Sequence, residues 1–191
     1  MSSSATNLQK SQQCLEEMRL DSATKQKKGL HFILGSVLIW TAVLGIHLTD
    51  LPILTKNLYT FFATAPLMPL AYLISRFIGV QFTDKGNPLN GLGFIFSLNQ
   101  LLYLLIAMWV FPASPEQMVM VLAMIFGAHL LPYGWLYKSK SYMALSVVIP
   151  IAALFIGVNY PPAAVAGFMI IVEILFSALL ILEVKRLPAS A

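Results

Sequence analysis

Six long apolar stretches, separated by short polar breaks, follow an initial polar segment of the chain. They cover residues 30–48, 58–82, 91–111, 117–137, 141–158 and 163–184. Each stretch is close to the ~20 residues that a helix needs to cross the ~30 Å hydrocarbon core of a bilayer. A backbone surrounded by lipid must satisfy its own hydrogen bonds, so these stretches are expected to be helices. The pattern predicts an all-α, polytopic membrane helical bundle with six transmembrane helices.

The same pattern predicts one membrane domain with two short flanks. Residues 1–28 form a polar N-terminal segment, residues 29–186 the six-helix domain and residues 187–191 a short tail. The first segment begins with serines expected to be disordered, and it is too polar for a cleavable signal peptide. Its weakly amphipathic second half favours a solvated lead-in to the first membrane helix. A short helix at the lipid surface is the alternative.

Composition and charge support a membrane location and give an orientation. Hydrophobic residues make up 58% of the chain and charged residues 10%, whereas a soluble domain carries roughly a quarter charged residues. All 12 Lys and Arg residues except Lys56 lie in segments that a six-helix thread places on one side. The positive-inside rule then predicts that both termini are cytoplasmic.

Charge and cysteine content also limit the partners. The cations are scattered between apolar blocks instead of forming the dense patch that phosphate binding requires, so we expect no nucleic acid partner. Cys14 is the single cysteine, which excludes an intrachain disulfide and a thiolate metal cluster. We expect the lipid bilayer as partner, with no cofactor and no metal. A small-molecule or proton ligand and a homo-oligomer are left open.

Four polar residues fall near the middle of three predicted helices, within about one helical turn of the membrane midplane. They are Asn99 and Gln100, His129, and Glu173. A charged side chain at this depth costs at least ~2.5–3.5 kcal/mol, so its presence calls for a reason. Glu173 shares its helix face with small residues, which predicts that it points into the bundle. We expect it to be protonated there, because an unpaired buried carboxylate is the costlier state.

Two function classes follow from these residues, and both stay open. In the first, the protein is a small proton-coupled carrier that binds its substrate or proton at Glu173, His129, Gln100 and Asn99. In the second, it is a non-catalytic membrane scaffold or sensor, and the same groups form hydrogen bonds between helices. A cavity that reaches Glu173 favours the carrier, whereas dry packing favours the scaffold. We expect no enzyme, because no hydrolase, zinc or phosphate-loop motif is present.

Prolines and aromatic residues add structural expectations. Pro66 and Pro150 lie in the middle helices of the two three-helix halves, a placement that occurs in transporters with broken helices, although local kinks are the favoured interpretation.

Two lysines are surrounded by the aromatic residues Tyr133, Trp135, Tyr137 and Tyr142, which predicts an aromatic belt at the headgroup level. His31 and His47 lie at the ends of the first helix, where we expect contact with water.

Three segments give the chain a family resemblance. They are residues 87–94 (NPLNGLGF), 99–103 (NQLLY) and 123–142 (AMIFGAHLLPYGWLYKSKSY). On these segments the chain resembles a domain-of-unknown-function family of small bacterial multi-spanning membrane proteins. The resemblance implies a bacterial inner-membrane protein, and it implies no activity, substrate, cofactor or site residue.

Overall fold

The computed structural model describes residues 2–82 and 86–187, with side chains from residue 7 onward. Its helices are α1 (Ser2–Lys25), α2 (Leu30–His47), α3 (Ile53–Thr64), α4 (Leu67–Ile78), α5 (Pro88–Ala113), α6 (Met118–Leu136), α7 (Lys140–Asn159) and α8 (Pro162–Lys185). Short 3-10 turns, η1 (Lys27–Gly29) and η2 (Pro115–Gln117), precede α2 and α6. Six helical spans in these residues, counting α3 and α4 as one, are long and apolar enough to cross a membrane, which confirms the predicted all-α bundle.

The predicted boundaries hold to within three residues for every span except the second. That span was expected at residues 58–82 and lies at Ile53–Ile78. Pro52 directly precedes the helix, where its fixed φ favours an early start. Gly79, with a φ of 67°, ends α4 early in a left-handed cap. The predicted turn at residues 83–85 and the tail residues 188–191 lie outside the described residues.

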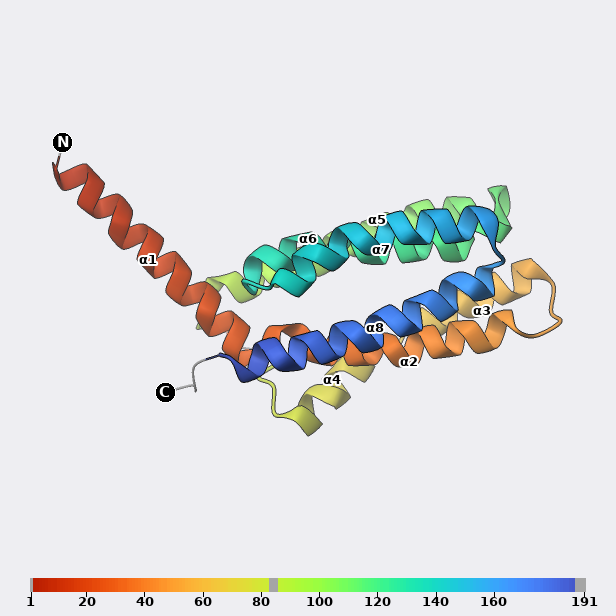
Figure 1. Ribbon diagram of the computed structural model, residues 1–191, viewed down its shortest axis with the longest axis horizontal. Coiled ribbons are helices and arrows are strands. Elements are labelled where there is room, and N and C mark those ends of the chain that lie inside the picture. The colour runs from red at the N-terminus through yellow and green to blue at the C-terminus, as the bar shows by residue number, and fades with distance from the viewer. Residues whose placement is uncertain (1, 83–85, 188–191) are drawn as a thin grey trace.

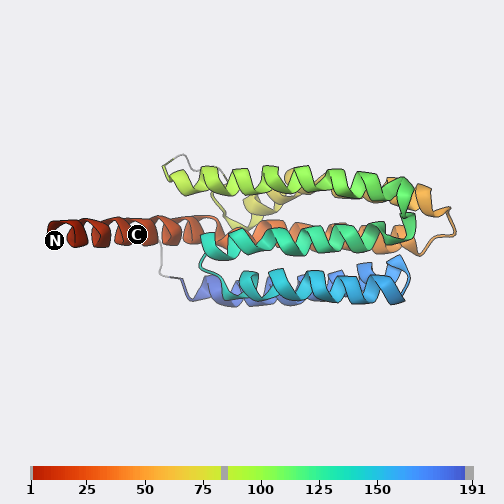
Figure 2. The same ribbon diagram turned by 90° about the horizontal axis from the view of Figure 1, so that it is seen from above.

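The spans form two layers, which Figure 1 shows one above the other. In one layer α6 packs between α5 and α7, and in the other α2 packs between α8 and the α3–α4 pair. Contacts of α8 with α6 and α7 join the layers. Figure 2 shows the helices α2, α5, α6, α7 and α8 running along one common axis. We call the end of the bundle where α1 and the C-terminal end of α8 lie, together with Lys28, Lys138 and Lys140, the basic end.

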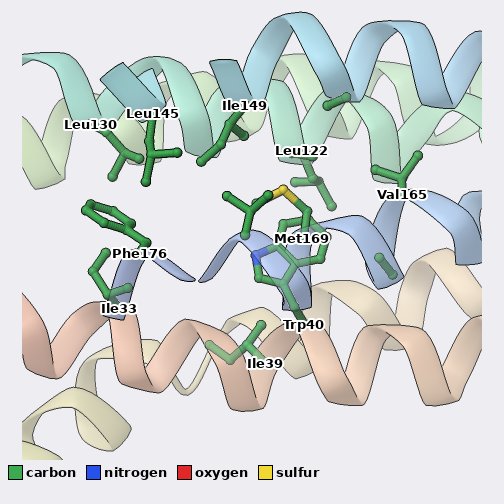
Figure 3. Packing of buried hydrophobic residues seen from close by; sticks show 14 of the residues in the cluster. Ile33, Ile39, Trp40, Leu122, Leu130, Leu145, Ile149, Val165, Met169 and Phe176 are labelled. Atoms are coloured by element: carbon green, nitrogen blue, oxygen red, sulfur yellow. The ribbon is translucent and has the colours of Figure 1, made fainter. Parts of the chain in front are cut away.

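Apolar side chains from four helices fill the space between the two layers, as Figure 3 shows. They include Ile33, Ile39 and Trp40 of α2, Leu122 and Leu130 of α6, Leu145 and Ile149 of α7, and Val165, Met169 and Phe176 of α8. Lipid tails are as apolar as these side chains, so close packing, not removal from water, is what stabilises such a core in a bilayer.

The closest helix contact, between α6 and α7, depends on glycine. A Cβ atom added at Gly127 would lie 2.6 Å from Cδ of Pro150 and 2.7 Å from Cγ2 of Ile149. Met143 crowds Gly134, and Met120 crowds Gly157, in the same way. These glycines let the two backbones approach, which is the usual role of small residues in membrane helix pairs.

The second span is broken in its middle. α3 ends at Thr64, Pro66 caps the new start at Leu67, and α4 then leaves the layer at an angle (Figure 1). Pro150 and Pro132, in contrast, lie inside the continuous helices α7 and α6. Proline therefore interrupts one of the two middle helices and leaves the other continuous.

In the N-terminal segment, α1 begins at Ser2 and its second half docks on the basic end. Ser22 and Gln26 donate hydrogen bonds to the side-chain oxygen of Asn90, at 2.7 and 2.8 Å. The guanidinium of Arg19 lies 4.5 Å from the centre of the Trp135 ring, within cation–π range. Sequence periodicity missed this helix because polar and ionic contacts hold it in place.

A left-handed turn joins α1 to α2, with φ values of 46° at Lys27, 51° at Lys28 and 71° at Gly29. Such a conformation is strained for a residue with a Cβ, so its surroundings must hold it. The buried ammonium of Lys28 lies 2.8 Å from Oε2 of Glu183. The Tyr142 hydroxyl donates to the carbonyl of Lys28 at 2.9 Å. These contacts fix the turn against α7 and α8.

The predicted aromatic belt is wrong for the three tyrosines. Tyr137 and Tyr142 are each 3% exposed, and Tyr133 is partly buried against Phe96. Their hydroxyls find partners inside the protein, so they do not need the headgroup region. Of the predicted belt, Trp135 is the exposed member, at 44%.

The expected contact of His31 and His47 with water is also wrong. The two side chains are 2% and 7% exposed. Nε2 of His47 lies 3.1 Å from the hydroxyl of Thr60, and the ring of His31 packs on Phe32 and Phe82.

Candidate functional site

An elongated cavity of about 480 Å³ lies between α2, the α3–α4 pair, α5 and α6. Its wall on α2 runs from Gly29 to Val43, which is about 21 Å at 1.5 Å per helical residue. The volume falls in the ~300–1,000 Å³ range of small-molecule sites. Most of its lining is apolar, and among the described residues no Asp, Glu, Lys or Arg belongs to it.

The cavity opens sideways, between α4 and α5. Its lining includes Met68 of α4 and Phe94, Leu98 and Leu101 of α5, and these side chains are 44–58% exposed. α4 packs on α2 and α5 packs on α6, so the two helices border the opening from opposite sides. Because α4 leaves the layer after Pro66, the broken helix helps to form the opening. A bilayer around the protein would meet this mouth with its hydrocarbon core.

Gln100 and His129 lie at one level of the cavity. The hydroxyls of Ser97 and Tyr133 lie 2.6 Å apart and fix the register of the antiparallel pair α5 and α6. Gln100 is three residues beyond Ser97, and His129 is four residues before Tyr133, so both stand near the middle of their helices. Both line the cavity. The structure therefore brings these two predicted site residues together.

Trp40 is a cavity residue that the sequence did not single out. Its ring packs edge-on against Phe126 at 6.5 Å between centroids, and the His129 ring packs against the same Phe126 at 5.3 Å. Its indole nitrogen can donate one hydrogen bond and accept none. Tryptophan counts as an apolar residue in a hydropathy pattern, so no sequence signal distinguishes it from core tryptophans.

Most other polar groups in the cavity wall are already engaged. Seven of these groups are hydroxyls that already donate hydrogen bonds to neighbouring carbonyls or side chains. They belong to Ser36, Thr60, Thr64, Ser97, Tyr133, Tyr137 and Tyr142. Among the described residues, Gln100 and the Trp40 indole make no hydrogen bond, and His129 bonds through Nδ1 alone, to the carbonyl of Phe126 at 2.5 Å. The hydrogen-bonding capacity left for a ligand is concentrated in these three side chains.

Glu173 lies behind the cavity wall. It is fully buried, as its small-residue face predicts, and its Oε2 is 2.6 Å from the hydroxyl of Ser36, which does line the cavity. Ser36 also bonds the carbonyl of Ile33 at 2.8 Å. One hydroxyl proton cannot serve both contacts, so both are satisfied when a protonated Glu173 donates to Ser36 and Ser36 donates to Ile33.

The second oxygen of Glu173 agrees with a neutral acid. Oε1 is buried and has no hydrogen-bond partner among the described residues. A carboxylate in this position would leave a full charge unsatisfied in an apolar interior, which costs far more than an unsatisfied neutral carbonyl. A proton on Glu173 therefore stabilises the observed packing.

Asn99 does not join the other predicted site residues. It is exposed on the outer face of α5, and its amide donates to the hydroxyl of Tyr103 at 3.0 Å. Gln100 lines the cavity, whereas Asn99 is not part of its lining. In the described part of the chain, no three His, Cys, Asp or Glu side chains are close enough to hold a metal ion.

Comparison with known proteins adds a family and no activity. No curated protein and no solved structure shows significant similarity to the chain. One family matches, and its match spans residues 15–183, from the docked half of α1 to the ion pair at the end of α8. With most of its length covered, the chain belongs to DUF7010, a family of unknown function.

Proposed function

We propose that the protein is a small carrier that binds an apolar solute in the cavity and moves it in the bacterial inner membrane. The observation that carries this proposal is the cavity itself, with Gln100 and His129 at its middle level and its mouth between α4 and α5. A binding site halfway along the spans is where carriers of alternating access hold their substrates. The proposal includes the basic end as the cytoplasmic end.

Glu173 is the proposed proton site of this carrier. Ser36 separates its carboxyl from the cavity, so a solute or water at Ser36 competes for the hydrogen bond that holds the proton. Loss of that bond would leave the carboxyl free to exchange its proton. Binding in the cavity and the protonation state of Glu173 are coupled in this way through one side chain.

Proteoliposomes with an internal pH-sensitive dye test the proposal. We expect at least one member of a panel of uncharged apolar solutes to change the rate of proton movement. Leu101→Trp, which places a larger ring at the mouth, should abolish that response. Leu102→Trp is the matched control, because Leu102 is 63% exposed on the same helix and does not line the cavity.

A wild-type protein that moves no protons with any solute, or a Leu101→Trp variant that responds normally, contradicts the carrier.

The second candidate, a scaffold or sensor, is favoured by a specific observation. Glu173 makes a single side-chain hydrogen bond to another helix and is sealed from the cavity by Ser36. That arrangement also suits a bond whose role is to hold α2 against α8.

A further inference from the structure

We propose that the cavity ligand is an uncharged apolar molecule carrying one hydroxyl group, which binds between His129, Trp40 and Gln100. This inference rests on the proposed function, since it names the class of solute that the cavity takes. It follows from the hydrogen-bonding capacity of the three side chains and from the absence of charge in the described cavity lining.

His129 presents an acceptor to the cavity. Its Nδ1 must carry the ring proton, because the partner at 2.5 Å is the Phe126 carbonyl, which only accepts. A charged imidazolium has no carboxylate to pair with in the cavity wall and is costly among apolar side chains. In the neutral ring the other nitrogen, Nε2, has a lone pair and no proton. A ligand group that meets Nε2 must therefore donate.

Trp40 presents the opposite group. Its indole N–H donates only, and both Trp40 and His129 line the cavity and pack on the ring of Phe126. Gln100, at the same level, can donate and accept. A hydroxyl has one proton to give and two lone pairs, so it can satisfy an acceptor and a donor together.

Charged ligands fit less well. A carboxylate or phosphate has no proton for Nε2 and would meet no Lys or Arg in the described lining, and an ammonium group would meet no Asp or Glu. The apolar remainder of the ligand fits the rest of the wall, and the exposed Leu98, Leu101 and Phe94 give it access from the hydrocarbon side. The ligand class is thus a lipophilic alcohol or phenol.

A ligand pair that differs in the hydroxyl alone tests this inference. The two probes are 4-hexylphenol and its methyl ether, 4-hexylanisole, titrated calorimetrically into the protein in lipid nanodiscs, with empty nanodiscs as the blank. We expect the phenol to bind about tenfold more tightly, because the ether cannot donate to Nε2 and leaves it unpaired.

Variants at His129 assign the preference. His129→Phe should bind both probes alike, because Nε2 is then absent for both, and measurable binding of the ether reports that the cavity is intact. His129→Gln, which keeps an acceptor, should retain part of the preference. Equal binding of both probes to the wild type, or an unchanged preference in His129→Phe, would overturn the inference and leave the carrier proposal standing. If neither probe binds the wild type, the proposed function itself fails.

Discussion

The role of Glu173 depends on its buried hydrogen bond to Ser36. Two variants of Glu173 distinguish a proton site from a contact that only holds the helices together. In Glu173→Gln the amide can still donate to Ser36 but cannot release a proton. We expect its unfolding midpoint in detergent to match the wild type, while solute-driven proton movement in proteoliposomes is lost. In Glu173→Leu the bond to α2 disappears, and we expect a loss of roughly 1 kcal/mol in the free energy of unfolding.

The same two variants can contradict the carrier. If Glu173→Gln moves protons with its solute as the wild type does, Glu173 is a helix contact and the scaffold is the better description. Ser177→Ala serves as a control on the same helix, because its hydroxyl donates to the Glu173 backbone carbonyl within α8 and, among the described residues, makes no hydrogen bond to another helix.

At the residue scale, sequence reasoning located the buried polar groups but not their surroundings. Glu173, Gln100 and His129 could be found because polarity at mid-depth is expensive wherever it occurs. Asn99 shares that depth with Gln100, and only the helix orientation places it outside. Trp40 and Ser36 could not be found, since an indole N–H or a hydroxyl becomes significant only when its neighbours are known.

At the element scale, the α6–α7 contact is the most sensitive to side-chain volume. In Gly127→Ala the new methyl group would meet Pro150 and Ile149 at 2.6–2.8 Å, so one helix must shift. Overpacking of this kind costs about 1–3 kcal/mol, and we expect a lower unfolding temperature. Gly167→Ala in α8 is the matched control, because nothing lies within 4 Å of the added Cβ. Equal midpoints for the two variants would argue against a close α6–α7 contact.

The docking of α1 should depend on pH. The Glu16 carboxylate accepts hydrogen bonds from Lys138 and Arg19. The bond from Lys138 and, more weakly, the charge of Arg19 hold the pKa of Glu16 below its ordinary value of 4.5. Because the folded-state pKa is lowered, this contribution is complete above about pH 4.5 and is lost as the pH falls through the lowered value. The tether between α1 and the turn after α6 therefore weakens in acid.

A nitroxide on Cys14, the single cysteine and an exposed one, reports this change. We expect its mobility to be constant from neutral pH down to about 4.5 and to rise below that value. Glu16→Gln should be mobile already at neutral pH and show no acid transition. A transition that persists in Glu16→Gln would contradict the assignment of the effect to Glu16.

The elements themselves were largely predictable, because the bilayer thickness fixes the length of an apolar helix. The exceptions have local causes. Pro52 moves the start of the second span to an earlier residue, and Pro66 breaks the span in its middle. A hydropathy window averages over both effects. The docked helix α1 was not predicted, because its contacts are ionic and polar and their partners lie more than sixty residues away in sequence.

At the scale of the whole molecule, the two-layer arrangement could not be predicted from the sequence. Apolar spans all offer similar surfaces, and which of them become neighbours depends on detailed packing, such as the fit of glycines between α6 and α7. The cavity arises from this arrangement, because α4 and α5 diverge where α6 and α2 hold them apart. Its residues come from six helices that no local pattern connects.

The orientation of the whole bundle in the membrane follows from which groups gather at each end. The ion pair of Lys28 with Glu183 joins the start of the first span to the end of the sixth, at the basic end. At the opposite end, the Asn57 amide donates to the Pro115 carbonyl at 2.8 Å, which places the loops near Asp50 and Ser114 on one side. The positive-inside rule assigns the basic end to the cytoplasm. Alkaline phosphatase fused after Asp50 or Ser114 should therefore be active, and a fusion after Ser139 inactive. The reverse pattern would invert the orientation, and equal activity after Ser114 and Ser139 would mean that α6 does not cross the membrane.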